Sequence, residues 1–391
     1  MSATLPVLAA AGANAAFASF LLFGLGLLGN ALVPARLRPA ASVTRFAMSL
    51  SIGTAAFGWT TWVLGSLAGT KVLPFLWLAL AAFSLRAIRP WVTVLLQVAR
   101  RCGALLRSSP LSSAALLLAA APLAFSLCLP LVDNDGIRYH VALPKLYLLT
   151  GRVFLYPWDV TGAYPQLGNM LYLAGLFAGS VEAAKFLNTG FLAAVCVVLA
   201  LTLHRSHGSR GAALAGPLLF LACPVVGVVA GPGFIDHIAL FHLVTALVMT
   251  LRRGHPLLTG LALGAALATK LTLAPGAVAI GVASALLRPR RERLRAFLVI
   301  PAATAAVLAP FAIRNAVALG DPFYPILTLA TGRPTPGVSP DVFRKYTSFN
   351  KKNAGPLGVV WQTPDSGEDD ETAGIHNLAG LLLLFFGLRD R

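Results

Sequence analysis

Two aspartates open a polar segment in a chain that otherwise has few acids. The sequence "PLVDNDGIRYHVALPK" (130–145) places Asp133 and Asp135 two positions apart, directly after an apolar run. Two carboxylates at this spacing in an extended stretch can share a divalent cation, or one can act as a base while the other orients it. They could also simply end a helix in a solvated loop. Because the whole chain has only 14 acids, we favour a functional role.

Further polar residues follow the two aspartates and are candidates for substrate binding. Four come within ten positions: Arg138, Tyr139, His140 and Lys145. The stretch 141–151, "VALPKLYLLTG", predicts a short helix along the membrane surface, because Pro144 is tolerated in a first turn and Gly151 is a natural stop. The next stretch, "YPWDVTGAYPQLGN" (156–169), adds aromatic residues including Tyr164. We expect it to form a wall of the same site.

The motif "GPGFIDHIALFH" (231–242) places Asp236 and His237 at the start of an apolar run, 237–251, that we predict to cross a membrane. Both are candidate substrate-binding residues. For Asp236, helix N-capping is a sufficient structural reason, and His237 could equally be an interfacial side chain. We expect His242, one turn deeper, to be a packed histidine.

Two cationic motifs complete the set of candidates. Lys270 lies inside the apolar run "LATKLTLAP" with no acid near it in sequence. It could extend toward the outer surface or act as a point charge for a phosphate. Arg314 and Asn315 lie near a predicted helix end in "PFAIRNAVALGDPFYPIL" (310–327). Arginine binds phosphate bidentately, and the alternative role is that of an interfacial anchor.

Composition predicts that a membrane bundle positions these residues. Hydrophobic residues make up 57% of the 391-residue chain and charged residues 12%, and the mean hydropathy is +0.77. We therefore predict an all-α polytopic membrane protein with about 10–11 transmembrane helices. The apolar runs fall near 8–34, 47–69, 72–88, 111–132, 183–203, 211–230, 237–251, 256–272, 274–287 and 296–313, with a shorter one at 378–388.

Two further apolar stretches do not fit a crossing. Residues 167–179 are too few to span a bilayer and predict a re-entrant or interfacial helix. Residues 89–101 carry arginines at both ends and could lie flat on the membrane. The first large outer loop, 132–182, should therefore carry short interfacial helices.

The basic residues predict the orientation of the bundle. The formal net charge is +17, but these residues form short clusters between apolar runs, so nucleic acid is not a predicted partner. The five clusters are 36–45, 86–107, 205–210, 252–253 and 288–295. The positive-inside rule assigns all five to the cytoplasm. The candidate site residues then fall together on the outer face.

The outer motifs resemble those of the GT-C membrane glycosyltransferases. The likeness rests on four stretches in the same order: "DNDGIRYHVALPKLYLLTGRV…AYPQLGNMLYLAG", "FIDHIALFHLVTAL", "GLALGAALATKLTLAP" and "RNAVALGDPFYPIL". Among GT-C enzymes the chain is most similar to bacterial relatives of the protein O-mannosyltransferases and of the lipid A aminoarabinose transferases. We therefore divide the chain into N-terminal helices with a basic segment (1–110), a GT-C-like core (111–327) and a polar segment with a short terminal helix (328–391).

The resemblance implies an enzyme of the bacterial cytoplasmic membrane with its active site on the periplasmic face. The donor would be a polyprenyl-phosphate-linked sugar, and the acceptor a glycan, a lipid or a protein. Asp133 or Asp135 would match the loop aspartate that acts as base or metal contact, with Mg²⁺ or Mn²⁺ between the carboxylates or with no metal. Lys270 and Arg314 would face the lipid phosphate. The alternatives are a transporter or lipid flippase, or an inactive structural membrane subunit.

Overall fold

The described part of the chain is an all-helical bundle. The computed structural model describes residues 4–129, 135–156, 160–230 and 233–324, and this part of the chain contains no strand. Five stretches are long and apolar enough to cross a membrane: Ala9–Leu32 within α1, Thr70–Ser108, Pro110–Leu127 (α5), Ala183–His207 (α8) and Arg290–Leu319 (α14). The predicted all-α polytopic class is confirmed.

Most of the remaining helices follow predicted apolar runs, but the run 211–230 is divided between two helices, and α6 and α7 lie outside these runs. The long stretch Thr70–Ser108 contains α3 (Leu73–Ser84) and α4 (Ile88–Ser108). The other helices are α2 (Ser42–Leu67), α6 (Ala142–Thr150), α7 (Leu167–Phe177), α9 (Arg210–Leu221), α10 (Pro224–Ala230), α11 (Asp236–Leu251), α12 (Pro256–Thr269) and α13 (Ala274–Leu286). The last predicted run, 378–388, lies outside the described residues.

α7 is a buried core helix. All residues from Leu167 to Gly175 are buried, and α7 packs against α2, α6, α8 and α12. A helix at a membrane interface would expose one face, so the interfacial interpretation of 167–179 is wrong. The re-entrant interpretation agrees with a short helix enclosed by longer ones.

α4 has the character expected for residues 89–101. Its buried residues Trp91, Val94, Val98 and Leu105 recur at helical spacing on one side, and its arginines are exposed. Trp91 packs against Phe46 of α2 with a ring separation of 6.0 Å. The helix is therefore amphipathic, and its position relative to the bilayer stays a prediction.

Small residues let α12 and α14 pack backbone to backbone. A Cβ on Gly260 would come within 2.5 Å of the Ile300 carbonyl oxygen, and one on Gly264 within 2.9 Å of the Thr304 carbonyl oxygen. Thr304 also donates a hydrogen bond to the Gly260 carbonyl at 3.0 Å. This small-xxx-small contact is a typical way for membrane helices to associate. It fixes the relative positions of Lys270, at the end of α12, and Arg314, near the end of α14.

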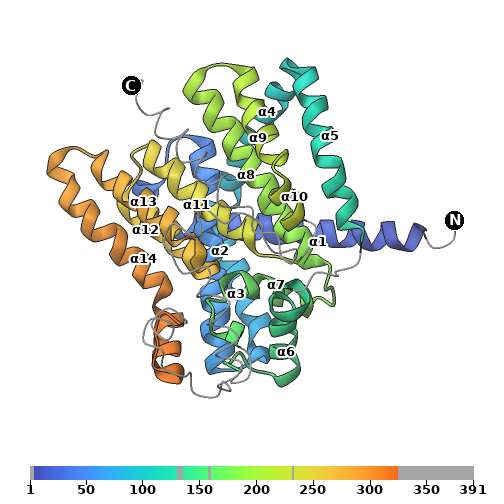
Figure 1. Cartoon of the computed structure of the whole chain (residues 1–391), viewed down its shortest axis with the longest axis vertical. Helices are drawn as coiled ribbons and strands as arrows, with labels where there is room; N and C mark the ends of the chain where they lie inside the picture. The colour runs from blue at the N-terminus through green and yellow to red at the C-terminus, as the bar shows by residue number, and fades with distance from the viewer. Residues whose placement is uncertain (1–3, 130–134, 157–159, 231–232, 325–391) are drawn as a thin grey trace, which may run out of the picture.

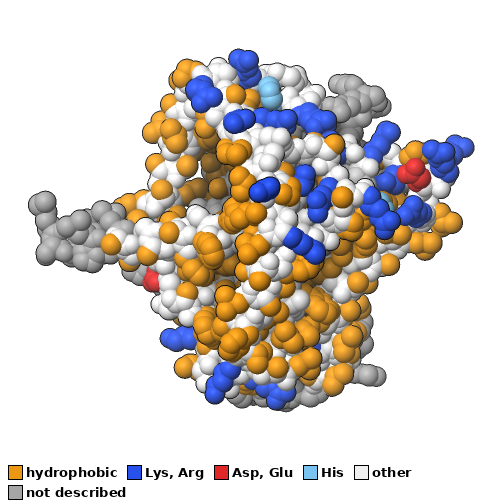
Figure 2. All heavy atoms as spheres, turned by 180° about the vertical axis from the view of Figure 1, so that it is seen from behind, with side chains coloured by type: hydrophobic (Ala, Val, Ile, Leu, Met, Phe, Trp, Pro, Cys, Tyr) orange, Lys and Arg blue, Asp and Glu red, His pale blue; other side chains and the backbone are white. Residues whose placement is uncertain are grey.

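Two loops that are predicted to lie on the outer side contact each other. At one end, the Thr70 amide donates to the Gly151 carbonyl at 2.8 Å, and the Val153 amide donates to the Gly65 carbonyl at 3.0 Å. We call this the predicted outer end; α6 and the last turns of α14 lie there, low in Figure 1. On the face in Figure 2, lysine and arginine side chains gather mainly in the upper part, and hydrophobic side chains cover much of the surface below. We call the end with the basic loops the predicted cytoplasmic end.

Candidate functional site

The segment after the two aspartates folds as its sequence predicts. Gly136–His140 form a π-helical turn that leads into α6. Leu143 and Tyr147 are buried, and the helix ends at Gly151, which has a φ of +74°. Glycine adopts this left-handed conformation without steric cost. The predicted helix at 141–151 and its glycine stop are both confirmed.

His140 begins a chain of buried hydrogen bonds. Asn169 Nδ2 donates to Gln166 Oε1 at 2.5 Å, and Asn169 Oδ1 lies 3.0 Å from His140 Nδ1. Because an amide oxygen can only accept, His140 Nδ1 is protonated and donates this hydrogen bond. Gln166 Nε2 in turn donates to the carbonyls of Thr161 and Tyr164, at 3.2 and 3.1 Å. These hydrogen bonds therefore link the π-helical turn before α6 through α7 to the segment 160–166.

The second ring nitrogen of His140, Nε2, is a hydrogen-bond acceptor without a partner among the described residues. With the proton on Nδ1, Nε2 is unprotonated, and this atom is buried without a hydrogen-bond partner in the described ranges. Burial lowers the pKa of His140 to about 4; the Asn169 hydrogen bond opposes the shift, the charge of Lys270 adds to it, and those of Asp236 and Asp135 also oppose it. The imidazole is therefore neutral at pH 7.

Arg314 and Asn315 reach the same segment from α14. Arg314 Nη2 donates to the Ala163 carbonyl at 2.8 Å and to the Tyr164 carbonyl at 3.3 Å, and Asn315 Nδ2 donates to the Ala163 carbonyl at 2.8 Å. The guanidinium also lies 5.7 Å from the ring centroid of Trp62. Arg314 is thus an internal contact of the bundle, and the interfacial-anchor interpretation is wrong. Its Nη1 is buried and has no hydrogen-bond partner in the described part of the chain.

Lys270 has an acid partner that the local sequence does not reveal. Its Nζ lies 2.6 Å from Asp236 Oδ1, and the two side chains are 31% and 27% exposed. Asp236 is the first residue of α11, and Ile235 occupies the N-cap position without a side-chain cap. The N-cap interpretation of Asp236 is therefore wrong. The second oxygen, Asp236 Oδ2, is buried without a hydrogen-bond partner in the described residues.

The two histidines of α11 are both core residues. His237 is 1% exposed; its Nδ1 lies 3.1 Å from Asn188 Nδ2, and its backbone amide donates to Asn188 Oδ1 at 3.1 Å. The interfacial interpretation of His237 is wrong. His242 is fully buried, with Nδ1 2.8 Å from Ser51 Oγ, so its expected packing role is confirmed.

Among the other residues predicted to form the site, some contact one another in the structure and others do not. Tyr139 donates to Asp135 Oδ2 at 2.8 Å, which orients this carboxylate. Arg138 and Lys145 are exposed and make no hydrogen bond or ion pair with other described residues. Tyr164 is half-buried and contributes its carbonyl to the contacts above. Asp133 lies outside the described residues.

The described residues do not form a metal site. They contain no group of three or more His, Cys, Asp or Glu side chains that could hold an ion. One oxygen of Asp135 already accepts from Tyr139. The predicted Mg²⁺ or Mn²⁺ site also needs Asp133, and the described residues supply only one of its two carboxylates.

Sequence reasoning missed several polar residues of the same region. Gln166 and Asn169 join His140 to the segment 160–166, and Asn188 anchors the start of α11. Lys185 of α8 is 1% exposed and donates to the carbonyls of Ser126, at 3.0 Å, and Leu129 at the end of α5. An isolated lysine in an apolar run was the available signal for Lys185, as it was for Lys270. Amides carry no such signal.

Comparison with known proteins finds one family whose model matches part of the chain. Residues 165–347 match the model of glycosyltransferase family 87, a GT-C-type family of membrane glycosyltransferases. The match includes α7, Asp236, Lys270 and Arg314 and begins after the two loop aspartates. The predicted resemblance to GT-C enzymes is confirmed. No curated protein and no solved structure matches the chain.

Proposed function

Because residues 165–347 match a GT-C-type family of membrane glycosyltransferases, we propose that the chain transfers a sugar from a polyprenyl-phosphate donor to an acceptor hydroxyl. The observation that carries this proposal is that three of the buried polar atoms without a hydrogen-bond partner among the described residues belong to this region: His140 Nε2, Asp236 Oδ2 and Arg314 Nη1. Buried polar atoms are nearly always hydrogen-bonded. We therefore assign these three atoms to the binding of a polar substrate. The histidine nitrogen and the carboxylate oxygen would accept hydrogen bonds from it, and the guanidinium nitrogen would donate one.

The contacts between these elements support a common site. His140 is joined to Arg314 through Asn169, Gln166 and the Tyr164 carbonyl. The charges of Asp236 and Lys270 are close enough to shift the pKa of His140. A polar cluster within a membrane bundle is costly unless it serves a substrate path or an interface.

The proposed reaction is an inverting displacement. Asp133 or Asp135 takes the proton from the acceptor hydroxyl while that oxygen forms a bond to the anomeric carbon. The bond from this carbon to the phosphate oxygen breaks, and its electron pair remains on the polyprenyl phosphate. Arg314, through Nη1, and Lys270 stabilise the negative charge on the leaving group. His140 Nε2 accepts a hydrogen bond from a sugar or acceptor hydroxyl and positions it.

The proposed place of the reaction is the periplasmic face of a bacterial cytoplasmic membrane. The positive-inside rule supports this orientation, because the five basic clusters belong to the opposite side. A lipid-tailed donor suits a site near the end of a membrane bundle. The acceptor would be a glycan, a lipid or a protein that presents a hydroxyl on that face.

The test is sugar transfer in proteoliposomes with radiolabelled polyprenyl-phosphate sugars. We expect transfer by the wild type and a loss of about a hundred-fold or more in the Asp133→Asn/Asp135→Asn double variant, as is typical when a catalytic base is removed. Glu182→Gln removes a carboxylate from the same loop and serves as the matched control. Full transfer by the double variant would exclude the proposed base. Movement of the donor across the bilayer without transfer would instead support a flippase.

A further inference from the structure

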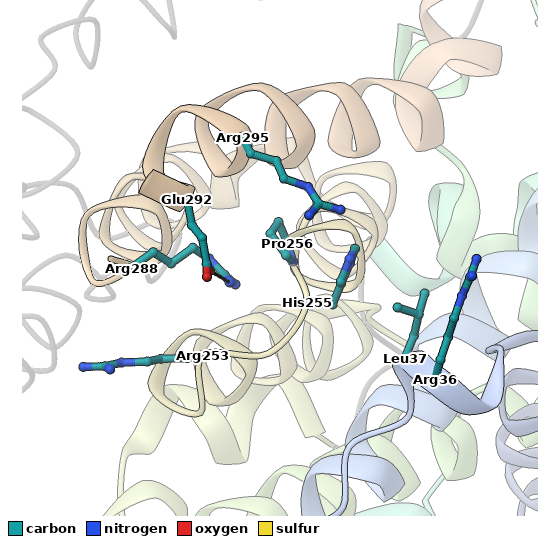
Figure 3. A pocket seen from close by; sticks show the side chains of 8 residues that line it. All are labelled: Arg36, Leu37, Arg253, His255, Pro256, Arg288, Glu292 and Arg295. Atoms are coloured by element: carbon teal, nitrogen blue, oxygen red, sulfur yellow. Dashed lines mark ion pairs between the residues drawn. The ribbon is translucent and has the colours of Figure 1, made fainter. Parts of the chain in front are cut away.

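A basic pocket lies at the predicted cytoplasmic end, away from the candidate catalytic residues. It forms where η1 (Ala35–Leu37), the turn before α12 and the start of α14 meet, and its volume is about 350 Å³. Figure 3 shows Arg288 and Glu292 on one side, Arg295 extending over Pro256 and His255, and Arg36 beside Leu37. Its lining residues are Arg36, Leu37, Arg253, His255, Pro256, Arg288, Glu292 and Arg295.

The pocket has a large excess of positive charge. Four arginines and one glutamate line it, so its formal charge is +3 with His255 neutral. His255 responds to this charge: burial lowers its pKa, and the charges of Arg295, Arg288 and Arg36 lower it further. His255 Nδ1 accepts a hydrogen bond from the Leu257 amide at 3.3 Å, so this nitrogen carries no proton. An anion in the pocket would offset the repulsion among these groups.

Arg288 is the residue that points to a ligand. Its side chain is only 6% exposed, although it is an arginine. Nη2 donates to the Gly254 carbonyl, and Nη1 lies 3.8 Å from Glu292 Oε2. Its Nε is buried without a hydrogen-bond partner among the described residues. A charged donor that is buried without an acceptor is unfavourable. A ligand that supplies an acceptor to Arg288 Nε would therefore be stabilised here.

Orientation in the membrane does not explain this arrangement. The positive-inside rule needs only basic residues in a short loop, and the neighbouring Arg290 and Arg291, which are exposed, meet that need. It does not require arginines from three separate segments to line one cavity, or one of them to be buried. The convergence needs a separate explanation.

We propose that this pocket binds the phosphate group of a phosphorylated ligand. Guanidinium groups match phosphate oxygens in geometry and charge, and a pocket of this size has room for a phosphate group together with part of the molecule that carries it. The ligand chemistry is a phosphate monoester or diester, or pyrophosphate. Its source is either a free phosphorylated molecule or the headgroup of an anionic lipid.

The experiment uses the full chain in lipid nanodiscs and two probes. Titration with inorganic pyrophosphate in phosphatidylcholine nanodiscs tests for a free anion. Native mass spectrometry of protein from nanodiscs that also contain phosphatidylglycerol tests for retention of an anionic lipid. The variants are Arg288→Gln and Arg295→Gln. Arg291→Gln is the matched control, because it removes the same charge from the same helix outside the pocket.

Arg295→Gln should weaken binding of the recognised probe roughly ten-fold, since it removes one charge-assisted contact, and Arg291→Gln should leave it within about two-fold. Arg295 is exposed, so its variant tests the site even if Arg288→Gln fails to fold. A pyrophosphate response that Arg295→Gln weakens would identify a free ligand, and a lipid response would identify a headgroup. Binding of neither probe, or equal binding by the Arg295 and Arg291 variants, would overturn the proposal. Neither assay depends on sugar transfer.

Discussion

The ion pair between Asp236 and Lys270 gives a sharp test of the site. Asp236→Asn removes the carboxylate charge that lies 2.6 Å from Lys270 Nζ. Exposed pairs contribute about 0.2–1 kcal/mol, and removal of one partner from a buried pair costs about 3–5 kcal/mol. Because these side chains are 27% and 31% exposed, we expect a loss of about 1–3 kcal/mol in the free energy of unfolding.

A double-mutant cycle separates the pair from its surroundings. We expect Asp236→Asn and Lys270→Met each to destabilise the protein, and the double variant to lose less than the sum of the two by about 1–2 kcal/mol. The assay is reversible unfolding in mixed micelles of sodium dodecyl sulfate and a mild detergent. Glu182→Gln combined with Lys270→Met is the control and should be additive. A coupling below about 0.3 kcal/mol for Asp236 and Lys270 would refute the reasoning.

The same cycle distinguishes a structural lysine from a catalytic one. If Lys270 only ties α12 to α11, the double variant should recover transfer activity as it recovers stability. If Lys270 stabilises the leaving phosphate, the double variant should fold well and still lose turnover, because no other residue replaces the charge. We expect the second result. Equal turnover in the double variant and the wild type would exclude Lys270 from the proposed mechanism.

Four other predictions follow from single features. The pKa of His140 is about 4 in the folded state and near 6.5 in the unfolded state, so the unfolded state binds more protons between these pH values. The free energy of unfolding of the wild type should therefore fall by up to about 3 kcal/mol as the pH drops from 6.5 to 4. Unfolding measured against pH tests this, and the His140→Gln variant should lose less stability over the same range. Gly264→Leu should separate α12 from α14 and cost about 1–3 kcal/mol or more in unfolding assays, whereas an unchanged stability would contradict the close backbone contact. Lys185→Met should remove the lysine donor from the Leu129 carbonyl and one of the two donors from the Ser126 carbonyl. It should cost about 1–3 kcal/mol, seen as a lower thermal midpoint. If Asp133 or Asp135 acts as a base without metal, transfer should persist in EDTA, and a loss that Mg²⁺ or Mn²⁺ reverses would establish the metal alternative.

The sequence predicts features that depend on local composition. The helix α6 and its stop at Gly151 follow from a proline in the first turn and a terminal glycine. The helices of the bundle follow from the apolar runs between basic clusters. Both signals lie within about one helical length of chain, so a single sequence contains them in full.

The sequence does not predict contacts between distant helices. Asp236 and Lys270 are separated by 34 positions, and each has a sufficient local explanation when it is read alone. In the same way, α7 is only 11 residues long, and its length does not show whether it lies on the surface or inside the bundle. Packing against α2, α6, α8 and α12 decides that question, and no property of its own sequence reports it.

Arg314 shows that a structural role and a functional role can belong to one side chain. Pro165 disfavours helical backbone at Tyr164, so the carbonyls of the segment 160–166 need partners other than a helix ladder. Arg314 Nη2 and Asn315 provide them. A guanidinium has five donors in a rigid fork, so the contacts that hold this segment also fix the direction of Nη1, the one nitrogen left without a partner among the described residues. A lysine at this position could not meet both demands, because a single ammonium has no second nitrogen to orient.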